Sequence, residues 1–157
     1  MYRHVLFSCF VLALTACTPD EVTGPGEIRW DREVCARCSM AIGDRSFAAQ
    51  VRGAAAGERT RLYKFDDIGC AVIWLEQQVW KNDPRTEVWV MDHRNGEWLD
   101  ARRAAYVKGR ISPMNYGLAA QADVAGDVLD FEQAKTYIMT AEKQRHLHNG
   151  HKPAGQE

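Results

Sequence analysis

The sequence predicts an α+β fold with small, mainly antiparallel sheets, and three observations support this prediction. Short strand-like runs recur between turn signals, as in strands joined by hairpins. One apolar repeat of helical period lies in the middle of the chain, and a second helical segment lies near its end. The resulting order of hairpin, helix, strands, loop and helix is typical of an α+β domain. With 157 residues, of which 46% are hydrophobic, the chain has the length and apolar content of one ordinary domain.

The first half of this domain is predicted to be a hairpin followed by a helix. Residues 46–52 and 60–65 have the composition of strands, and the Gly/Ala-rich segment 53–58 joins them. The helix is expected to begin at Asp66-Asp67, because acidic side chains suit the positive end of a helix, and to end at Asn82-Asp83-Pro84. Its apolar positions recur at helical spacing: Ile68, Val72, Leu75 and Val79.

The second half is predicted to consist of short strands and a long helix. Residues 87–91 form a strand that turns at Arg94-Asn95-Gly96 and returns over 97–100, since Asn-Gly favours a tight hairpin turn. The remaining elements expected are a short strand at 105–107, a loop at 111–117, a last strand at 128–131 and a helix from about 132 to 145.

The first seventeen residues have the features of a lipoprotein signal peptide. Arg3 precedes an apolar run over residues 5–14, which is about half of the ~20 residues needed to span a bilayer. Leu14-Thr15-Ala16-Cys17 resembles a bacterial lipobox, which implies cleavage before Cys17 and its acylation by palmitate-like chains. We expect a lipid anchor facing the periplasm, in the outer membrane because Thr18 replaces the Asp of inner-membrane lipoproteins. The alternative is a buried N-terminal helix of a cytosolic protein.

These features divide the chain into four parts. We expect a signal peptide at 1–16, a lipidated tether at 17–29, one domain at 30–145 and a polar tail at 146–157. The 20 Lys and Arg residues are balanced by 21 Asp and Glu residues, for a formal net charge of −1. This balance leaves no positive surplus to bind a polyanion, so no nucleic-acid partner is expected.

Three sulfur side chains lie within six residues of each other, at Cys35, Cys38 and Met40. Thiolate and thioether groups are soft donors that favour Cu(I) over hard ions. Arg37 between the cysteines would help to keep a thiolate deprotonated, as a metal ligand must be. With Cys70, the mature chain has three unacylated thiols, and an odd number cannot form a closed set of disulfides. At least one thiol is therefore expected to be free.

Three other uses of these cysteines remain open. A redox pair of the thioredoxin kind would be followed by a long helix, and the sequence after Cys38 is too short for one. A structural zinc site needs four ligands, and only Cys70 and scattered histidines are available beside the first pair. A structural disulfide between Cys35 and Cys38 is the third alternative.

Several segments carry a resemblance to a known family: Cys38-Ser39-Met40-Ala41-Ile42, Tyr63-Lys-Phe-Asp-Asp-Ile-Gly-Cys70, Trp98-Leu-Asp-Ala101 with Ala105-Tyr-Val107, and Ser112-Pro-Met-Asn-Tyr-Gly117. Together they resemble the NosL family, accessory lipoproteins of nitrous oxide reductase. The resemblance implies two small ββαβ-type modules, similar to those of the organomercury lyase. It also implies a membrane-anchored copper chaperone of denitrification. Such a chaperone delivers Cu(I) to nitrous oxide reductase and its maturation machinery, for assembly of the copper–sulfide centre.

The same resemblance implies a set of ligands. Its Cys-x-Met motif falls on Cys38 and Met40, and its Ser-Pro-Met motif falls on Met114. Cys35 would be an extra ligand, or a partner that oxidises with Cys38 when the site is empty. The sequence departs from the family at Ser39 and Asn115, where glycine is common, and between residues 117 and 128, where a shorter segment is consistent with a lost helix.

Other side chains are weaker candidates. His93 could add a nitrogen donor and Met91 a sulfur donor, although a Met in a strand more often belongs to the core. Cys70 lies among apolar helix positions, where a free Cys usually behaves as a small buried hydrophobe. Asp66 and Asp67 could orient ligands, but helix capping explains them without a metal. The histidines near the C-terminus could bind Cu(II) weakly: His146, His148 and His151.

The sequence therefore predicts a protein that binds and delivers Cu(I), without catalytic turnover. No Ser-His-Asp or paired-carboxylate pattern stands out. The alternatives are a thiol–disulfide oxidoreductase that uses Cys35 and Cys38, a carbon–mercury lyase by analogy of fold, and a lipoprotein whose structural cysteines serve only to dock a partner.

Overall fold

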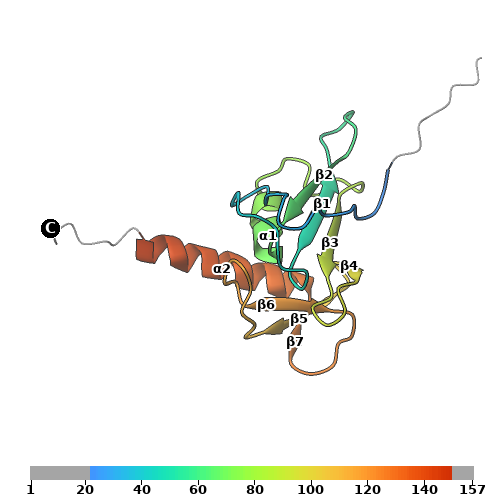
Figure 1. Ribbon diagram of the computed structural model, residues 1–157. Coiled ribbons are helices and arrows are strands. Elements are labelled where there is room, and N and C mark those ends of the chain that lie inside the picture. The colour runs from blue at the N-terminus through green and yellow to red at the C-terminus, as the bar shows by residue number, and fades with distance from the viewer. Residues whose placement is uncertain (1–21, 150–157) are drawn as a thin grey trace, which may run out of the picture.

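Residues 22–149, which the computed structural model describes, fold into two small antiparallel sheets and two helices, and this confirms the α+β class (Figure 1). The elements are β1 (Ala49–Gly53), β2 (Arg61–Phe65), α1 (Ile68–Glu76), β3 (Glu87–Met91), β4 (Trp98–Asp100), β5 (Ala105–Lys108), β6 (Leu118–Gln121), β7 (Val128–Leu129) and α2 (Phe131–Asn149). One sheet has the strand order β2-β1-β3-β4, and the other has the order β6-β5-β7.

The predicted hairpin forms, and its strand β1 lies in the middle of the larger sheet. This strand pairs along its whole length with β2, pairs with β3 on its other side, and is buried throughout. The amide of Gln50 exchanges hydrogen bonds of 2.8 and 2.7 Å with the backbone of Gly26. The guanidinium of Arg52 donates to the Gly24 carbonyl at 3.0 Å. Part of the range expected as a tether is therefore bonded to this sheet.

Helix α1 begins where the sequence predicts but ends earlier. Asp67 is its N-cap, and the Asp67 carboxylate accepts a hydrogen bond of 2.7 Å from the Gly69 N–H. After Glu76 the chain continues in turns, as at Gln78, whose N–H donates to a carbonyl three residues back. These turns break the helical period. Val79, expected on the apolar face, is 94% exposed, so that expectation is wrong.

The smaller sheet contains a strand that the sequence pattern does not predict. Strand β6 has the sequence Leu-Ala-Ala-Gln, and alanine is depleted in strands. It forms because it pairs with β5 and adjoins the end of β3, where the His93 N–H donates to the Ala120 carbonyl at 3.0 Å. All four residues of β6 are buried. This strand lies in the segment between residues 117 and 128 where the family resemblance suggested a lost helix.

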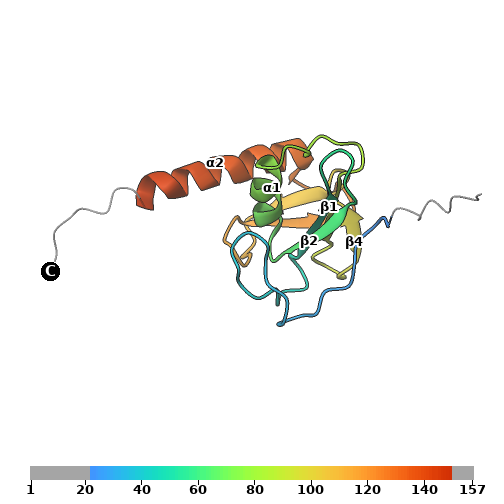
Figure 2. The same ribbon diagram turned by 90° about the horizontal axis from the view of Figure 1, so that it is seen from above.

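The helices take different places in the two modules. The first module runs β1-β2-α1-β3, as a ββαβ unit does, with β4 added at the edge of its sheet. The second runs β5-β6-β7-α2 within the described residues. Its order departs from ββαβ because β7 pairs with the central β5 before the helix begins. Helix α2 buries Ala134 and Ile138, and its C-terminal end projects beyond the sheets in Figure 1 and Figure 2.

The ends of the described chain bear on the expected domain boundaries. Helix α2 continues to Asn149, so the first residues of the expected tail, 146–149, are helical. Neither helix among the described residues has the length and apolar character needed to cross a bilayer. The expected signal peptide at 1–16, the lipidated Cys17 and residues 150–157 lie outside the described residues.

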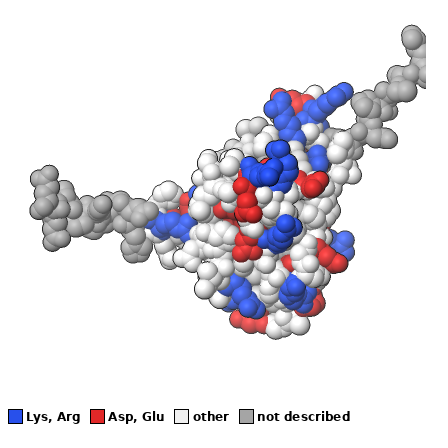
Figure 3. All heavy atoms as spheres, viewed as in Figure 1, with Lys and Arg blue, Asp and Glu red and all other residues white. Residues whose placement is uncertain are grey.

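Basic and acidic side chains are interspersed on the face of the molecule shown in Figure 3. Several of these charges form pairs, such as Arg94 with Asp92 at 2.9 Å and with Asp123 at 2.6 Å. Lys81 and Lys135 both bind Glu76, each at 2.6 Å. The mixture of signs on this face agrees with the small net charge of the chain.

Candidate metal centre

Three cysteine sulfurs and one carboxylate lie close together in the described part of the structure. The ligand atoms of Cys35, Cys38, Asp66 and Cys70 all lie within 4.8 Å of one another. The first two residues belong to the loop before β1, Asp66 follows β2 directly, and Cys70 lies in the first turn of α1. Cys35, Asp66 and Cys70 are at most 1% exposed, whereas Cys38 is partly exposed. The cluster therefore has a closed interior and one accessible side.

A tight backbone loop holds the first two cysteines. The Cys35 N–H donates to the Met40 carbonyl at 2.8 Å, and the Ser39 N–H donates to the Cys35 carbonyl at 3.0 Å. Ser39 adopts a positive φ of 62°, the left-handed conformation that glycine favours. Asn115 does the same with a φ of 55°. These two residues, which depart from the glycines common in the family that the sequence resembles, thus keep a backbone conformation that glycine permits.

Backbone N–H groups in and beside this loop are directed at the sulfurs. The N–H groups of Cys38 and Asp66 donate to the Cys35 sulfur, and the N–H of Met40 donates to the Cys38 sulfur. The loop is fixed to β2 by a 2.9 Å hydrogen bond from the Ala36 N–H to the Lys64 carbonyl. Hydrogen bonds of this kind stabilise a thiolate, whether it is free or bound to a metal.

Hydrogen bonding and burial separate the pKa values of the three thiols. The Cys70 thiol donates to Cys35, and this lowers the pKa of Cys35 to about 4 with help from the backbone N–H groups. The same hydrogen bond, together with burial, raises the pKa of Cys70. Burial and the neighbouring negative charges raise the pKa of Cys38 to about 11. Ionisation is therefore favoured at Cys35 over Cys38 and Cys70, and the thiols that keep their protons lose them when a metal binds.

The carboxylate of the cluster is also perturbed. Burial, and then the Cys35 thiolate, raises the pKa of Asp66 to about 6. The oxygens of Asp66 lie 3.5 and 3.6 Å from the Cys38 sulfur, within reach of a weak S–H hydrogen bond. Burial raises the pKa of Asp67 as well, although hydrogen bonds from Ser112, Gly69 and Met114 oppose this shift.

The cluster contains two of the four predicted sulfur ligands, Cys35 and Cys38. Met40 follows at the surface, where it is 52% exposed. Met114 lies in the loop that packs on the start of α1, and its N–H donates to an Asp67 oxygen at 3.3 Å. His93 does not belong to the cluster; its Nε2 is buried and has no hydrogen-bond partner among the described residues.

Two members of the cluster are residues for which the sequence favours other roles. Cys70 is buried, as expected, but it also contributes its sulfur to the cluster. Asp67 alone caps α1, which leaves the Asp66 carboxylate free to face the cysteines. Asp66 directly precedes the N-cap and Cys70 lies in the first turn of α1, so their closeness along the chain is the signal that could have shown them together.

The cluster also bears on the alternatives for these cysteines. Cys35 has the lowest pKa but is 1% exposed, whereas the more exposed Cys38 has a raised pKa. A reactive redox cysteine combines a low pKa with access to its substrate, and neither residue does so. For zinc, the expected shortage of ligands is wrong, because Asp66 supplies a fourth ligand atom beside the three sulfurs.

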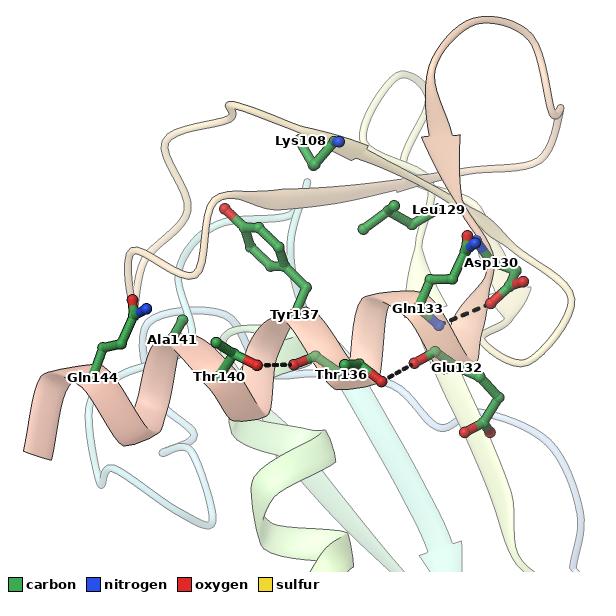
Figure 4. Close-up of a pocket in the computed structure, with 10 residues that line it drawn as sticks. All are labelled: Lys108, Leu129, Asp130, Glu132, Gln133, Thr136, Tyr137, Thr140, Ala141 and Gln144. Carbon is green, nitrogen blue, oxygen red and sulfur yellow. Dashed lines mark hydrogen bonds between the residues drawn. The ribbon is translucent and has the colours of Figure 1, made fainter.

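A separate groove of about 700 Å³ lies between α2 and the smaller sheet (Figure 4). Leu129 and Tyr137 face this space from β7 and α2, and Lys108 lies at the end of β5 above it. Its lining contains none of the four residues of the metal cluster.

Comparisons with known proteins found little similarity in sequence. No family model matches the chain, and no curated protein matches it. Among solved structures, the chain is similar to the copper chaperone NosL from Shewanella denitrificans, with 15% sequence identity and a TM-score of 0.45. The similarity covers 74% of this chain and 87% of the other.

Proposed function

We propose that this protein binds Cu(I) at Cys35, Cys38 and Cys70 and transfers it to a partner protein. The observation that carries the proposal is the meeting of three cysteine sulfurs within 4.8 Å. Sulfur ligands are soft and favour Cu(I), and an ion of this kind is the cargo of the protein rather than a catalytic cofactor. The donor set of the cluster fits such an ion.

The uneven exposure of the cluster supports transfer rather than permanent storage. Cys35 and Cys70 are buried, so they hold the ion from the interior. Cys38 is partly exposed, and Met40 beside it is 52% exposed. A sulfur ligand of a partner can therefore approach from the side of Cys38 and replace the protein's ligands one at a time.

We further propose that the destination is nitrous oxide reductase, whose copper–sulfide centre requires Cu(I) during assembly. The segments from Cys38 to Ile42 and from Ser112 to Gly117, which resemble the NosL family, support this destination. The sequence Leu14-Thr15-Ala16-Cys17 supports attachment of Cys17 to acyl chains at a membrane facing the periplasm, with Thr18 favouring the outer membrane.

A resident Zn²⁺ ion is the second candidate, and the position of Asp66 favours it. Three sulfurs and a carboxylate oxygen are four donors of types that bind Zn²⁺, an ion that is usually four-coordinate in structural sites. In that case the ion would stabilise the loop of Cys35 and Cys38 against α1 and would not be exchanged with a partner.

Anaerobic titration distinguishes these two candidates. The reduced, metal-free protein should bind one Cu(I) ion per chain against a competing chromophoric Cu(I) chelator, and Cu(I) should displace bound Zn²⁺. Met40→Ala should weaken Cu(I) binding by roughly tenfold or less, because this side chain is exposed and at most completes the site. Met139→Ala, which removes a similarly exposed methionine from α2, is the control.

The titration has two outcomes that oppose the proposal. Zn²⁺ that stays bound in the presence of excess Cu(I) would identify a structural zinc site. Cu(I) binding no tighter than that of a small thiol would exclude copper delivery, and the thiols would then be tested for disulfide exchange.

The proposed destination and anchor are tested together in a denitrifying bacterium that lacks its own copper chaperone for nitrous oxide reductase. Expression of this chain should restore consumption of nitrous oxide. Cys38→Ser should abolish the restoration, because it removes a sulfur of the cluster. Cys17→Ser should release the protein from the membrane fraction. Continued accumulation of nitrous oxide with the correctly localised wild-type chain would contradict this part of the proposal.

A further inference from the structure

Arg37, which lies between the two cysteines of the loop, connects the metal cluster to helix α2. Its Nη1 lies 3.9 Å from the Cys70 sulfur and 3.3 Å from the Tyr116 hydroxyl. Its Nη2 forms an ion pair with the carboxylate of Glu142 on α2. The side chain is 22% exposed, so water screens these contacts only in part. One guanidinium thus faces a cluster sulfur on one side and a carboxylate on the other.

Glu142 does not depend on Arg37 alone. Its carboxylate accepts a hydrogen bond of 2.8 Å from the Tyr116 hydroxyl, and it lies 3.6 Å from Arg145 and 3.2 Å from His146. Tyr116 is 1% exposed and packs so closely on Gly69 that a Cβ atom there would lie 2.1 Å from its ring. Several contacts therefore hold α2 against the rest of the protein, in addition to the ion pair between Arg37 and Glu142.

A cluster that holds Cu(I) carries an excess of negative charge, which the Arg37 guanidinium can offset. Three thiolates carry more negative charge than a single Cu(I) ion offsets, and the Asp66 carboxylate adds to the excess. Each thiol that becomes a copper thiolate releases its proton to solvent and leaves its negative charge in a largely buried site. A cation in contact with the Cys70 sulfur reduces the cost of that charge.

We propose that Arg37 is a positioning residue of the metal site, which offsets the negative charge of the loaded cysteine cluster and orients the Cys70 sulfur. The inference rests on the proposed function, because it concerns the affinity of the same site. It adds a residue that ligates no metal itself and reaches the cluster through its guanidinium.

A pair of variants separates this role from a merely structural one. Arg37→Gln removes the positive charge and should weaken Cu(I) binding by about tenfold to a hundredfold, the range found when a partner of a metal ligand is lost. Glu142→Gln removes the charge of the ion pair on α2 but leaves the guanidinium beside Cys70. Its affinity for Cu(I) should stay within about threefold of the wild type or become tighter. Arg37→Lys keeps a charge but loses the planar fork, and it should lie between the wild type and Arg37→Gln.

The measurement is anaerobic Cu(I) competition on all four proteins, with urea unfolding of their metal-free forms as a check on folding. Equal weakening by Arg37→Gln and Glu142→Gln would overturn the inference, because the ion pair with α2 would then be what matters. Wild-type affinity in Arg37→Gln would overturn it as well. If Arg37→Gln does not fold, the comparison of Arg37→Lys with Glu142→Gln decides in the same way. Failure of the wild type to bind Cu(I) would instead refute the proposed function and, with it, this inference.

Discussion

Cys70→Ala should lower the affinity for Cu(I) by at least about a hundredfold. Zinc-finger sites with four thiolate or imidazole ligands bind Zn²⁺ with about 10–16 kcal/mol, which shows how large a share of the binding energy one sulfur ligand can carry. The Cys70 sulfur belongs to the buried side of the cluster, within 4.8 Å of the other three ligand atoms. The loss should therefore far exceed the effect of Met40→Ala, whose side chain lies at the surface.

The same competition assay needs a control for damage to the helix. Val72→Ala truncates another buried side chain of α1, 3% exposed, and should destabilise the metal-free protein by about 2 kcal/mol. It removes no ligand, so its Cu(I) affinity should match the wild type. Unchanged affinity in Cys70→Ala would mean that the ion is held without this sulfur, and Cys70 would return to the role of a small buried hydrophobe.

Asp66→Asn should stabilise the metal-free protein at pH 7 by about 2–3 kcal/mol. Burial and the Cys35 thiolate raise the pKa of the folded carboxyl from 3.8 to about 6, and each pKa unit corresponds to about 1.4 kcal/mol. Because the folded state binds this proton more tightly than the unfolded chain, the contribution of Asp66 to stability falls as the pH rises from about 4 to about 6. Asparagine has a similar shape and no charge to bury.

Urea unfolding of both metal-free proteins between pH 3.5 and 7.5 tests this prediction. The difference between their free energies of unfolding should grow between pH 4 and 6 and stay constant above that range. Asp127→Asn, at a carboxylate 88% exposed, is the control and should change the stability by less than about 0.5 kcal/mol. A lower stability of Asp66→Asn at pH 7 would show that hydrogen bonding outweighs the cost of burying this charge.

The instability that Asp66 is expected to cause lies at the metal cluster itself. The carboxylate that destabilises the metal-free protein lies within 4.8 Å of the three cysteine sulfurs of the cluster. Functional sites commonly combine local instability with the chemistry they perform. The raised pKa of Asp66 is therefore consistent with the proposed metal site.

Much of the secondary structure follows from local chemistry, and the sequence is sufficient to predict it. The hairpin of β1 and β2, the capped start of α1 and the hairpin of β3 and β4 all appear close to their expected positions. Turn residues, capping side chains and the hydrophobic period act over a few neighbouring residues. Strand β6 and the early end of α1 depend instead on pairing and packing with other elements, so the local sequence propensity does not predict them.

The residues of the candidate site also fall into those that the local sequence predicts and those that only the fold brings together. The sequence by itself determined that soft sulfur donors are concentrated at Cys35, Cys38 and Met40, because their spacing is local. Only the tertiary structure decided that Asp66 and Cys70 join Cys35 and Cys38: the loop of the first two cysteines is bonded to β2, and β2 leads directly into α1. Contacts between residues about thirty positions apart depend on how the elements pack, and packing is a property of the whole fold.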